Sequence, residues 1–248
     1  MFPYVNLFGA AVAVAPLVIL LGIWFGASFS EKHAPKFHLD ASAVYNLIFL
    51  LLFSYVIGGR LSYAAQHPSA FAEDPMALIS RNFGLFDPLG GALIAVIAAA
   101  IYGQRKGLKM WPTLDALTPA LAVLMLAVPL ANLASGDAFG APSQVPWAVE
   151  LWGASRHPIQ IYEALAAAGI LVWLWPARLL ENGRPAGSYF LKFAAASAFA
   201  RMVFEGLRGA SPVTFLDLRI FQLAAWGVLA AALILLYQRG HAPQKETK

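Results

Sequence analysis

Seven apolar segments, each about 20 residues long, constrain the fold of this chain more than any other feature. They cover roughly residues 6–29, 44–65, 84–103, 113–135, 158–176, 187–205 and 218–237. Segments of this length can span a bilayer as helices, which satisfy their own backbone hydrogen bonds. The sequence therefore predicts an all-α membrane protein with about seven transmembrane helices in residues 1–238, followed by a short basic tail at residues 239–248. Pro119 and Pro129 predict a kink or a break in the fourth segment.

Composition supports this class and excludes several kinds of site. Hydrophobic residues make up 60% of the chain and charged residues 12%, whereas a soluble domain carries roughly a quarter charged residues. The chain has no cysteine, which excludes a cysteine nucleophile, a disulfide and a thiolate metal site. His33, His38, His67 and His241 lie in polar connections without the spacing of metal ligands. We therefore expect no metal and no other cofactor.

The basic residues divide unevenly between the two sides of the predicted membrane domain. The first, third and fifth connections and the tail contain ten of them: Lys32, Lys36, Arg105, Lys106, Lys109, Arg178, Arg184, Arg239, Lys245 and Lys248. The opposite side contains four, namely Arg81, Arg156, Arg208 and Arg219. Cytoplasmic loops are the ones enriched in cations, so this bias predicts the N-terminus outside and the C-terminus in the cytoplasm. It also accounts for the net charge of +4 without a nucleic-acid partner.

A run of polar side chains, RHPIQIYE at residues 156–163, stands at the start of the fifth apolar segment. Polar groups are costly inside a membrane, so such a run is a candidate functional site. Pro158 suits the first position of a helix, which would make His157 its cap and Gln160 its third residue. Arg156, Gln160 and Glu163 would then share one helix face, near a helix start that favours an anion such as phosphate.

A second polar set repeats the same spacing at the end of the sixth segment. Arg201, Glu205 and Arg208 lie at i, i+4 and i+7, and we expect them to meet the first set at the same membrane face. Arginines in such a pair of helix ends are suited to hold phosphate. The alternative is structural, because arginines also reach toward lipid headgroups and Arg–Glu pairs fix helix packing. Arg60, inside the second segment, predicts a buried anionic partner.

The two polar runs, RHPIQIYE and RMVFEGLR at residues 201–208, resemble the bacterial prolipoprotein diacylglyceryl transferases. Residues 59–63, Gly90 with Gly91, Asn132 with Gly136, residues 145–148 and Gln222 extend the resemblance in the family's order. It implies a seven-helix, multi-pass enzyme of the bacterial inner membrane. Such enzymes transfer a diacylglyceryl group from phosphatidylglycerol to the lipobox cysteine thiol of a preprolipoprotein and release glycerol phosphate.

The resemblance also implies roles for individual residues. Arg201 and Arg156 would clamp the phosphate, Glu205 would orient Arg201, and His157 or Glu163 would accept the thiol proton. For His157, a helix cap is the structural alternative. The residues expected to contact the lipid are Arg60, Asn132, Gly136, Gln160, Tyr162 and Arg208. No cofactor is implied.

The chain departs from the family pattern at four positions, two of which matter most. Leu89 stands where the family has a histidine before its paired glycines, and Pro129 stands where it has an arginine. Asp137 and Phe139 replace a glutamate and a tryptophan after Gly136. Three interpretations are therefore open: a diacylglyceryl transferase or close variant, a non-catalytic paralogue that binds an anionic phospholipid, and an accessory subunit of a larger membrane complex.

Overall fold

The computed structural model describes residues 3–7, 10–80, 82, 84–175, 185–209, 211–213 and 219–241, which are mostly helical. Its long helices are α1 (Val14–His33), α2 (Ala41–Gln66), α4 (Pro88–Arg105), α5 (Met110–Ser135), α6 (Ile159–Trp173), α8 (Ser188–Glu205) and α9 (Ile220–Gly240). Each overlaps one of the seven predicted apolar segments. Most of the predicted tail lies outside the described residues.

Within the described residues, five helices are long and apolar enough to cross a membrane: α1, α2, α4, α5 and α9. Helix α6 is also apolar but has only 15 residues. Helix α8 carries three charged side chains, Lys192, Arg201 and Glu205, among its 18 residues. The chain is thus a helical, multi-pass membrane protein.

The first helix begins later than its apolar segment predicts. Strands β1 (Tyr4–Leu7) and β2 (Ala10–Ala13) form an antiparallel pair, and α1 starts only at Val14. The expectation of one helix over residues 6–29 was therefore wrong at its N-terminal side. Pro16 explains the start, because proline has no N–H to bond a carbonyl four residues earlier and is tolerated only in the first turn of a helix.

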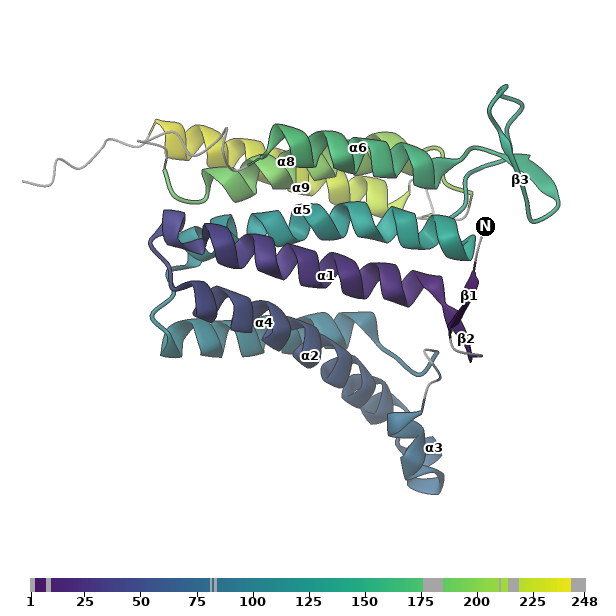
Figure 1. The fold of residues 1–248 in the computed structure, drawn as a ribbon, viewed down its shortest axis with the longest axis horizontal. Coiled ribbons are helices and arrows are strands. Elements are labelled where there is room, and N and C mark those ends of the chain that lie inside the picture. Colours follow the sequence, from purple (N-terminus) through teal and green to yellow (C-terminus); the bar gives the residue numbers. More distant parts are fainter. Residues whose placement is uncertain are drawn as a thin grey trace, which may run out of the picture.

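The long helices form three layers (Figure 1). Helices α1 and α5 lie in the middle, α2 and α4 on one side, and α6, α8 and α9 on the other. Small residues bring the two middle helices close together: a Cβ on Gly26 of α1 would lie 2.9 Å from the Ala120 Cα of α5. Close backbone approach of this kind is how helices pack where lipid removes the hydrophobic driving force.

Helix α5 is continuous despite the two prolines inside it. The sequence predicted a kink or a break at Pro119 and Pro129, and of these the break is absent. The backbone N–H of Ala120 donates a hydrogen bond to the Ser30 Oγ of α1, at 3.1 Å. A neighbouring helix thereby supplies a polar partner next to the proline, as membrane helices commonly do.

Shorter elements project beyond the ends of the bundle. Helix α3 (Pro68–Glu73) and the 3-10 helix η2 (Pro75–Ile79) extend from the end of α2, and the 3-10 helix η1 (Ala34–Phe37) follows α1. Strands β3 (Val149–Leu151) and β4 (Ala154–Arg156) form an antiparallel hairpin between α5 and α6. We call the end of the bundle that carries β3 and β4 the hairpin end.

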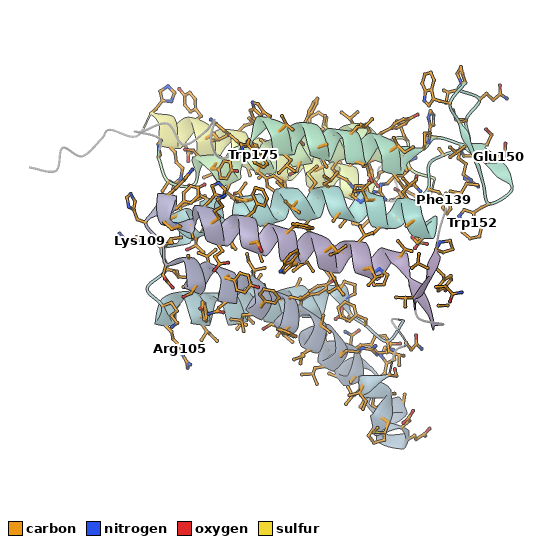
Figure 2. The ribbon with its side chains drawn as sticks, in the orientation of Figure 1. Arg105, Lys109, Phe139, Glu150, Trp152 and Trp175 are labelled. Atoms are coloured by element: carbon orange, nitrogen blue, oxygen red, sulfur yellow. The ribbon has the colours of Figure 1, made fainter. Side chains whose placement is uncertain are left out.

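Labelled side chains identify the two ends of the bundle. Figure 2 shows Arg105 and Lys109 at the end opposite the hairpin, whereas Phe139, Glu150 and Trp152 lie at the hairpin end. The N-terminal strands also lie at the hairpin end (Figure 1). Several of the cations counted in the sequence, including Arg178 and Arg184, lie outside the described residues.

Candidate active site

The RHPIQIYE run is divided between two elements. Arg156 is the last residue of β4, and α6 begins at Ile159, so Pro158 is the residue before the helix, with φ -76° and ψ 64°. The expected helix start at Pro158 with His157 as its cap was therefore wrong. A residue before proline avoids the helical conformation, and His157 instead donates its backbone N–H to the carbonyl of Ala141 at 3.1 Å.

Arg156 consequently shares no helix face with Glu163. Its Nε donates to the Leu151 carbonyl at 3.0 Å and its Nη1 to the Gly140 carbonyl at 3.3 Å. The guanidinium also lies 4.7 Å from the centre of the Phe139 ring. Arg156 thus joins the hairpin to the loop after α5, and the structure does not bring it to Arg201.

Four charged side chains from two helices and the following turn do meet at the hairpin end. Glu163 belongs to α6, Arg201 and Glu205 to α8, and Arg208 lies three residues after α8 ends. Arg201 Nε is 2.8 Å from Glu205 Oε2, and Arg201 Nη1 is 3.9 Å from Glu163 Oε1. Arg208 Nη2 donates to Glu163 Oε1 at 2.6 Å, and Arg208 Nε is 3.7 Å from Glu205 Oε2. We call these four residues the charge cluster.

The members of the charge cluster differ in exposure. The side chain of Glu205 is fully buried, those of Glu163 and Arg208 are 15% exposed, and that of Arg201 is 34% exposed. The two carboxylates balance the two guanidinium groups, as buried charges require. Glu205 approaches the Nε edge of Arg201, whereas Glu163 lies near its Nη1 atom at the longer distance of 3.9 Å.

Two further residues hold the charge cluster in place, and sequence reasoning missed both roles. Arg219 Nη1 donates to the backbone carbonyls of Glu205 at 2.7 Å and Arg208 at 3.1 Å. The Ser211 hydroxyl donates to Glu205 Oε1. Arg219 stands immediately before an apolar run. That position at a helix start was the one sequence signal that could have predicted a role for it.

A cavity of about 510 Å³ lies between α5, α6, α8 and α9, beside the charge cluster. Three of its lining residues are charged: Glu163, Arg201 and Arg208. The others, apart from Ser197, are apolar: Met125, Val128, Pro129, Ala166, Phe193, Ala198, Ala200, Phe204, Phe221, Ala224, Ala225 and Val228. The Arg201 guanidinium lies 5.3 Å from the centre of the Phe221 ring. The cavity is thus an apolar volume with charged groups along part of its wall.

Pro129 lines this cavity, at the position where the family resemblance implies an arginine. Leu89, which stands for the family's histidine, lies in the first turn of α4 and is 83% exposed. The substitution at position 129 therefore changes the wall of the cavity directly.

The remaining polar residues of the RHPIQIYE run surround the start of α6. Gln160 is buried and donates from Nε2 to the Asp137 carbonyl at 2.8 Å. The Tyr162 hydroxyl accepts a hydrogen bond from Trp147 Nε1. The His157 ring lies 6.2 Å from the Tyr162 ring, and its Nδ1 is buried without a hydrogen-bond partner among the described residues. Gln160 and Tyr162 thus join the start of α6 to the loops at the hairpin end.

Asn132 and Gly136 lie at the end of α5. Gly136 closes the helix with φ 84°, a conformation that favours glycine, and donates its N–H to the Asn132 carbonyl at 2.8 Å. The Gly136 carbonyl in turn accepts from Trp152 Nε1 at 3.0 Å. The two residues thereby set the direction of the loop that leads to the hairpin.

Arg60 lies on α2, in the layer that α2 forms with α4, and is absent from the cavity wall. Its Nη2 donates to the backbone carbonyl of Ser80 at 2.8 Å. Arg60 Nη1 and Ser80 Oγ are buried without a partner in the described part of the chain. The contact of Arg60 among the described residues is thus a backbone carbonyl, and its anionic partner stays a prediction.

Comparison with known proteins gives consistent matches over most of the chain. The family model described as prolipoprotein diacylglyceryl transferase matches residues 4–238. A phosphatidylglycerol–prolipoprotein diacylglyceryl transferase of Finegoldia magna is 26% identical over 93% of this chain and 92% of its own length. One from Azoarcus sp. is 28% identical over 84% of each chain. One from Methylococcus capsulatus is 31% identical over 63% of this chain and 62% of its own length.

Proposed function

Because the chain belongs to the prolipoprotein diacylglyceryl transferase family, we propose that it transfers a diacylglyceryl group from phosphatidylglycerol to the lipobox cysteine thiol of a preprolipoprotein. The names of its relatives contain both the lipid and the protein substrate. One structural observation carries the proposal: Arg201 borders an apolar cavity, and its closest ion pair, with the buried Glu205, is made through Nε. An arginine oriented in this way can present its Nη groups to a phosphate.

The reaction forms a carbon–sulfur bond and breaks a carbon–oxygen bond. The thiol sulfur attacks the terminal glyceryl carbon of the diacylglyceryl group, and the phosphate oxygen leaves with the bonding electron pair as glycerol phosphate. Arg201 stabilises the charge that grows on this phosphate, since a positioned donor acts most strongly where charge develops. Glu205 positions Arg201, and Arg208 adds a second cation at the cavity wall.

The thiol must lose its proton during the attack, and Glu163 is the better-placed acceptor. Its carboxylate lines the same cavity as Arg201 and contacts Arg208 at the cavity wall. His157, the other candidate, is not among the residues that line the cavity. We assign His157, Gln160 and Tyr162 to the support of the loops around the site.

We further propose that all seven long helices cross the bacterial inner membrane, with the hairpin end and the N-terminus outside and the C-terminus in the cytoplasm. Support comes from Arg105 and Lys109 at the opposite end of the bundle (Figure 2). Helix α6 has 15 residues and is about 22 Å long, less than a hydrocarbon layer of roughly 30 Å. The hairpin and loops at its start fit a site open to water on the outer side.

Pro129 supports one alternative, a lipid-binding protein without turnover. It lines the cavity where the family pattern has an arginine, so the wall has one cation fewer to stabilise a leaving phosphate. Such a protein would bind phosphatidylglycerol in the same cavity and release no product.

Substitution of Arg201 tests the proposal. Arg201→Ala should reduce transfer of labelled diacylglyceryl from phosphatidylglycerol to a lipobox peptide by about 100- to 1,000-fold, the typical cost of losing one preorganised donor. Arg105→Ala is the matched control, because Arg105 is exposed at the other end of the bundle. If the unmodified protein binds phosphatidylglycerol but releases no glycerol phosphate with any lipobox peptide, the lipid-binding alternative replaces the transferase.

A further inference from the structure

The cavity is charged at one end and apolar at the other. Helix α8 runs toward the hairpin end, so Arg201 lies near that end and Phe193 lies deeper in the bundle. Helix α6 runs the opposite way and places Glu163 near the same end, with Ala166 deeper. Helix α9 contributes only apolar residues to the wall, from Phe221 inward to Val228. The cavity therefore has a charged mouth and an apolar interior.

The depth of the apolar interior follows from helix geometry. Arg201 and Phe193 are eight residues apart on α8, which corresponds to about 12 Å along the helix axis. One leaflet of a bilayer accounts for roughly 15 Å of hydrocarbon, half of the total thickness. The interior is thus somewhat shallower than one leaflet, the layer that the acyl chains of a phospholipid fill.

The deep end of the cavity is closed by packed side chains. Phe193 is 8% exposed and packs in one cluster with Ala122, Leu174 and Tyr189. The Tyr189 hydroxyl donates to the Leu174 carbonyl at 2.6 Å, which ties α8 to the end of α6. Met125 of α5 packs against the same cluster and also lines the cavity. Phe193 and Met125 therefore form a fixed floor.

We propose that the apolar interior holds one fatty acyl chain of the donor phospholipid, with its methyl end toward Phe193, and that Phe193 limits the chain length accepted. This inference rests on the proposed function for the identity of the lipid, because the arginines at the mouth would hold its phosphate. Lipid tails are as apolar as leucine, so transfer from bilayer to cavity gives little hydrophobic energy. Selection among acyl chains of different length arises instead from steric fit, because extra methylene groups at the packed floor of the cavity would force strain.

Chain-length competition tests the inference. The measured quantity is the ratio of kcat/KM for dioctadecanoyl over ditetradecanoyl phosphatidylglycerol with one lipobox peptide. Phe193→Ala removes the side chain at the floor and should raise this ratio about tenfold or more, since one methylene alone is worth at least that in a fitted pocket. Phe199→Ala is the matched control: it lies on the same helix, is 55% exposed and does not line the cavity.

A second variant should change the kcat/KM ratio in the opposite direction, so the inference can still be tested if Phe193→Ala does not fold. Ala225 is 6% exposed and lines the cavity from α9, so Ala225→Leu should lower the same ratio by about tenfold. An unchanged ratio in the variants that fold overturns the inference and leaves the transferase proposal intact.

A binding measurement separates the two proposals. The protein is incubated with an equimolar mixture of the two phosphatidylglycerols, and the retained lipid is identified by mass spectrometry. If the protein shows no turnover, the transferase proposal fails. The acyl site is still supported in that case if Phe193→Ala or Ala225→Leu changes the chain length of the retained lipid. Equal retention of both lipids by the unmodified protein and both variants overturns the acyl site.

Discussion

Removal of the charge on Glu205 is the sharpest test of the charge cluster. Glu205→Gln keeps the size of the side chain and retains an oxygen that can accept from the Ser211 hydroxyl. It removes the negative charge that lies 2.8 Å from Arg201 Nε and 3.7 Å from Arg208 Nε. The variant thus keeps the volume of the side chain, removes its charge and replaces the oxygen that faces Arg201 Nε with an amide group that cannot accept a hydrogen bond.

The size of the effect follows from burial. Loss of one partner from a buried ion pair costs about 3–5 kcal/mol in free energy of unfolding, because the other charge stays buried and uncompensated. Glu163 still pairs with Arg208 in the variant, and Arg201 is 34% exposed, so we expect the lower end, about 3 kcal/mol. For a chain of this size that corresponds to a fall in Tm of roughly 6–12 °C.

Thermal unfolding of the purified protein in detergent measures this change. Glu150→Gln is the control, because Glu150 is an exposed carboxylate of β3, and its Tm should stay within about 2 °C of the unmodified protein. In a double-mutant cycle, Arg201→Gln combined with Glu205→Gln should cost at least about 1 kcal/mol less than the sum of the single changes. Additive effects, or an unchanged Tm in Glu205→Gln, would refute the view that this pair holds the site together.

Three further predictions concern orientation, the cavity wall and acid stability. A reporter fused after Lys248 should be cytoplasmic and one inserted near Asp137 periplasmic; the reverse pattern would exclude a secreted acceptor. Pro129→Arg places a guanidinium at the cavity wall and should raise the transfer rate in the peptide assay, by up to about 100-fold; an unchanged rate would show that Pro129 does not limit phosphate stabilisation. The hydrogen bond from the Ser62 hydroxyl, with others from backbone N–H groups and Gln66, lowers the pKa of Asp87. A lowered pKa gives stability that is present above the unfolded-state value of about 3.9 and is lost as pH falls through the folded-state value. The Tm difference between Asp87→Ala and the unmodified protein should therefore be larger at neutral pH than below about pH 3, and an equal difference at both would contradict this cause.

Local sequence was enough to predict where the helices lie, because hydrocarbon permits few backbone conformations other than the helix. Each of the seven apolar segments overlaps a long helix of the structure. The errors occur at helix starts beside prolines. Pro16 delays α1 to Val14, and α6 begins at Ile159, so Pro158 is its cap and not its first residue. Both effects are local, and closer attention to the residues around each proline could have predicted them.

Spacing along one helix also placed Arg201 and Glu205 on the same face, since residues four apart share one, and the structure shows the two in contact. The sequence likewise indicated that Glu163 would lie near them, at the same end of the bundle. It could not show that Arg156, seven residues before Glu163, turns away into the hairpin. The non-helical conformation of His157, the residue before Pro158, was sufficient to separate Arg156 from Glu163.

The sequence by itself therefore determined the membrane class, the positions of the helices and the polar residues that no lipid-facing surface would tolerate. Only the tertiary structure decided which charges meet. Glu163 and Arg208 are 45 residues apart, and Arg219 reaches the carbonyls of Glu205 and Arg208 from the start of another helix. Such contacts depend on how α6, α8 and α9 pack against one another. Packing reflects the combined shape of many side chains, whereas periodicity along a single helix reports only which residues share a face.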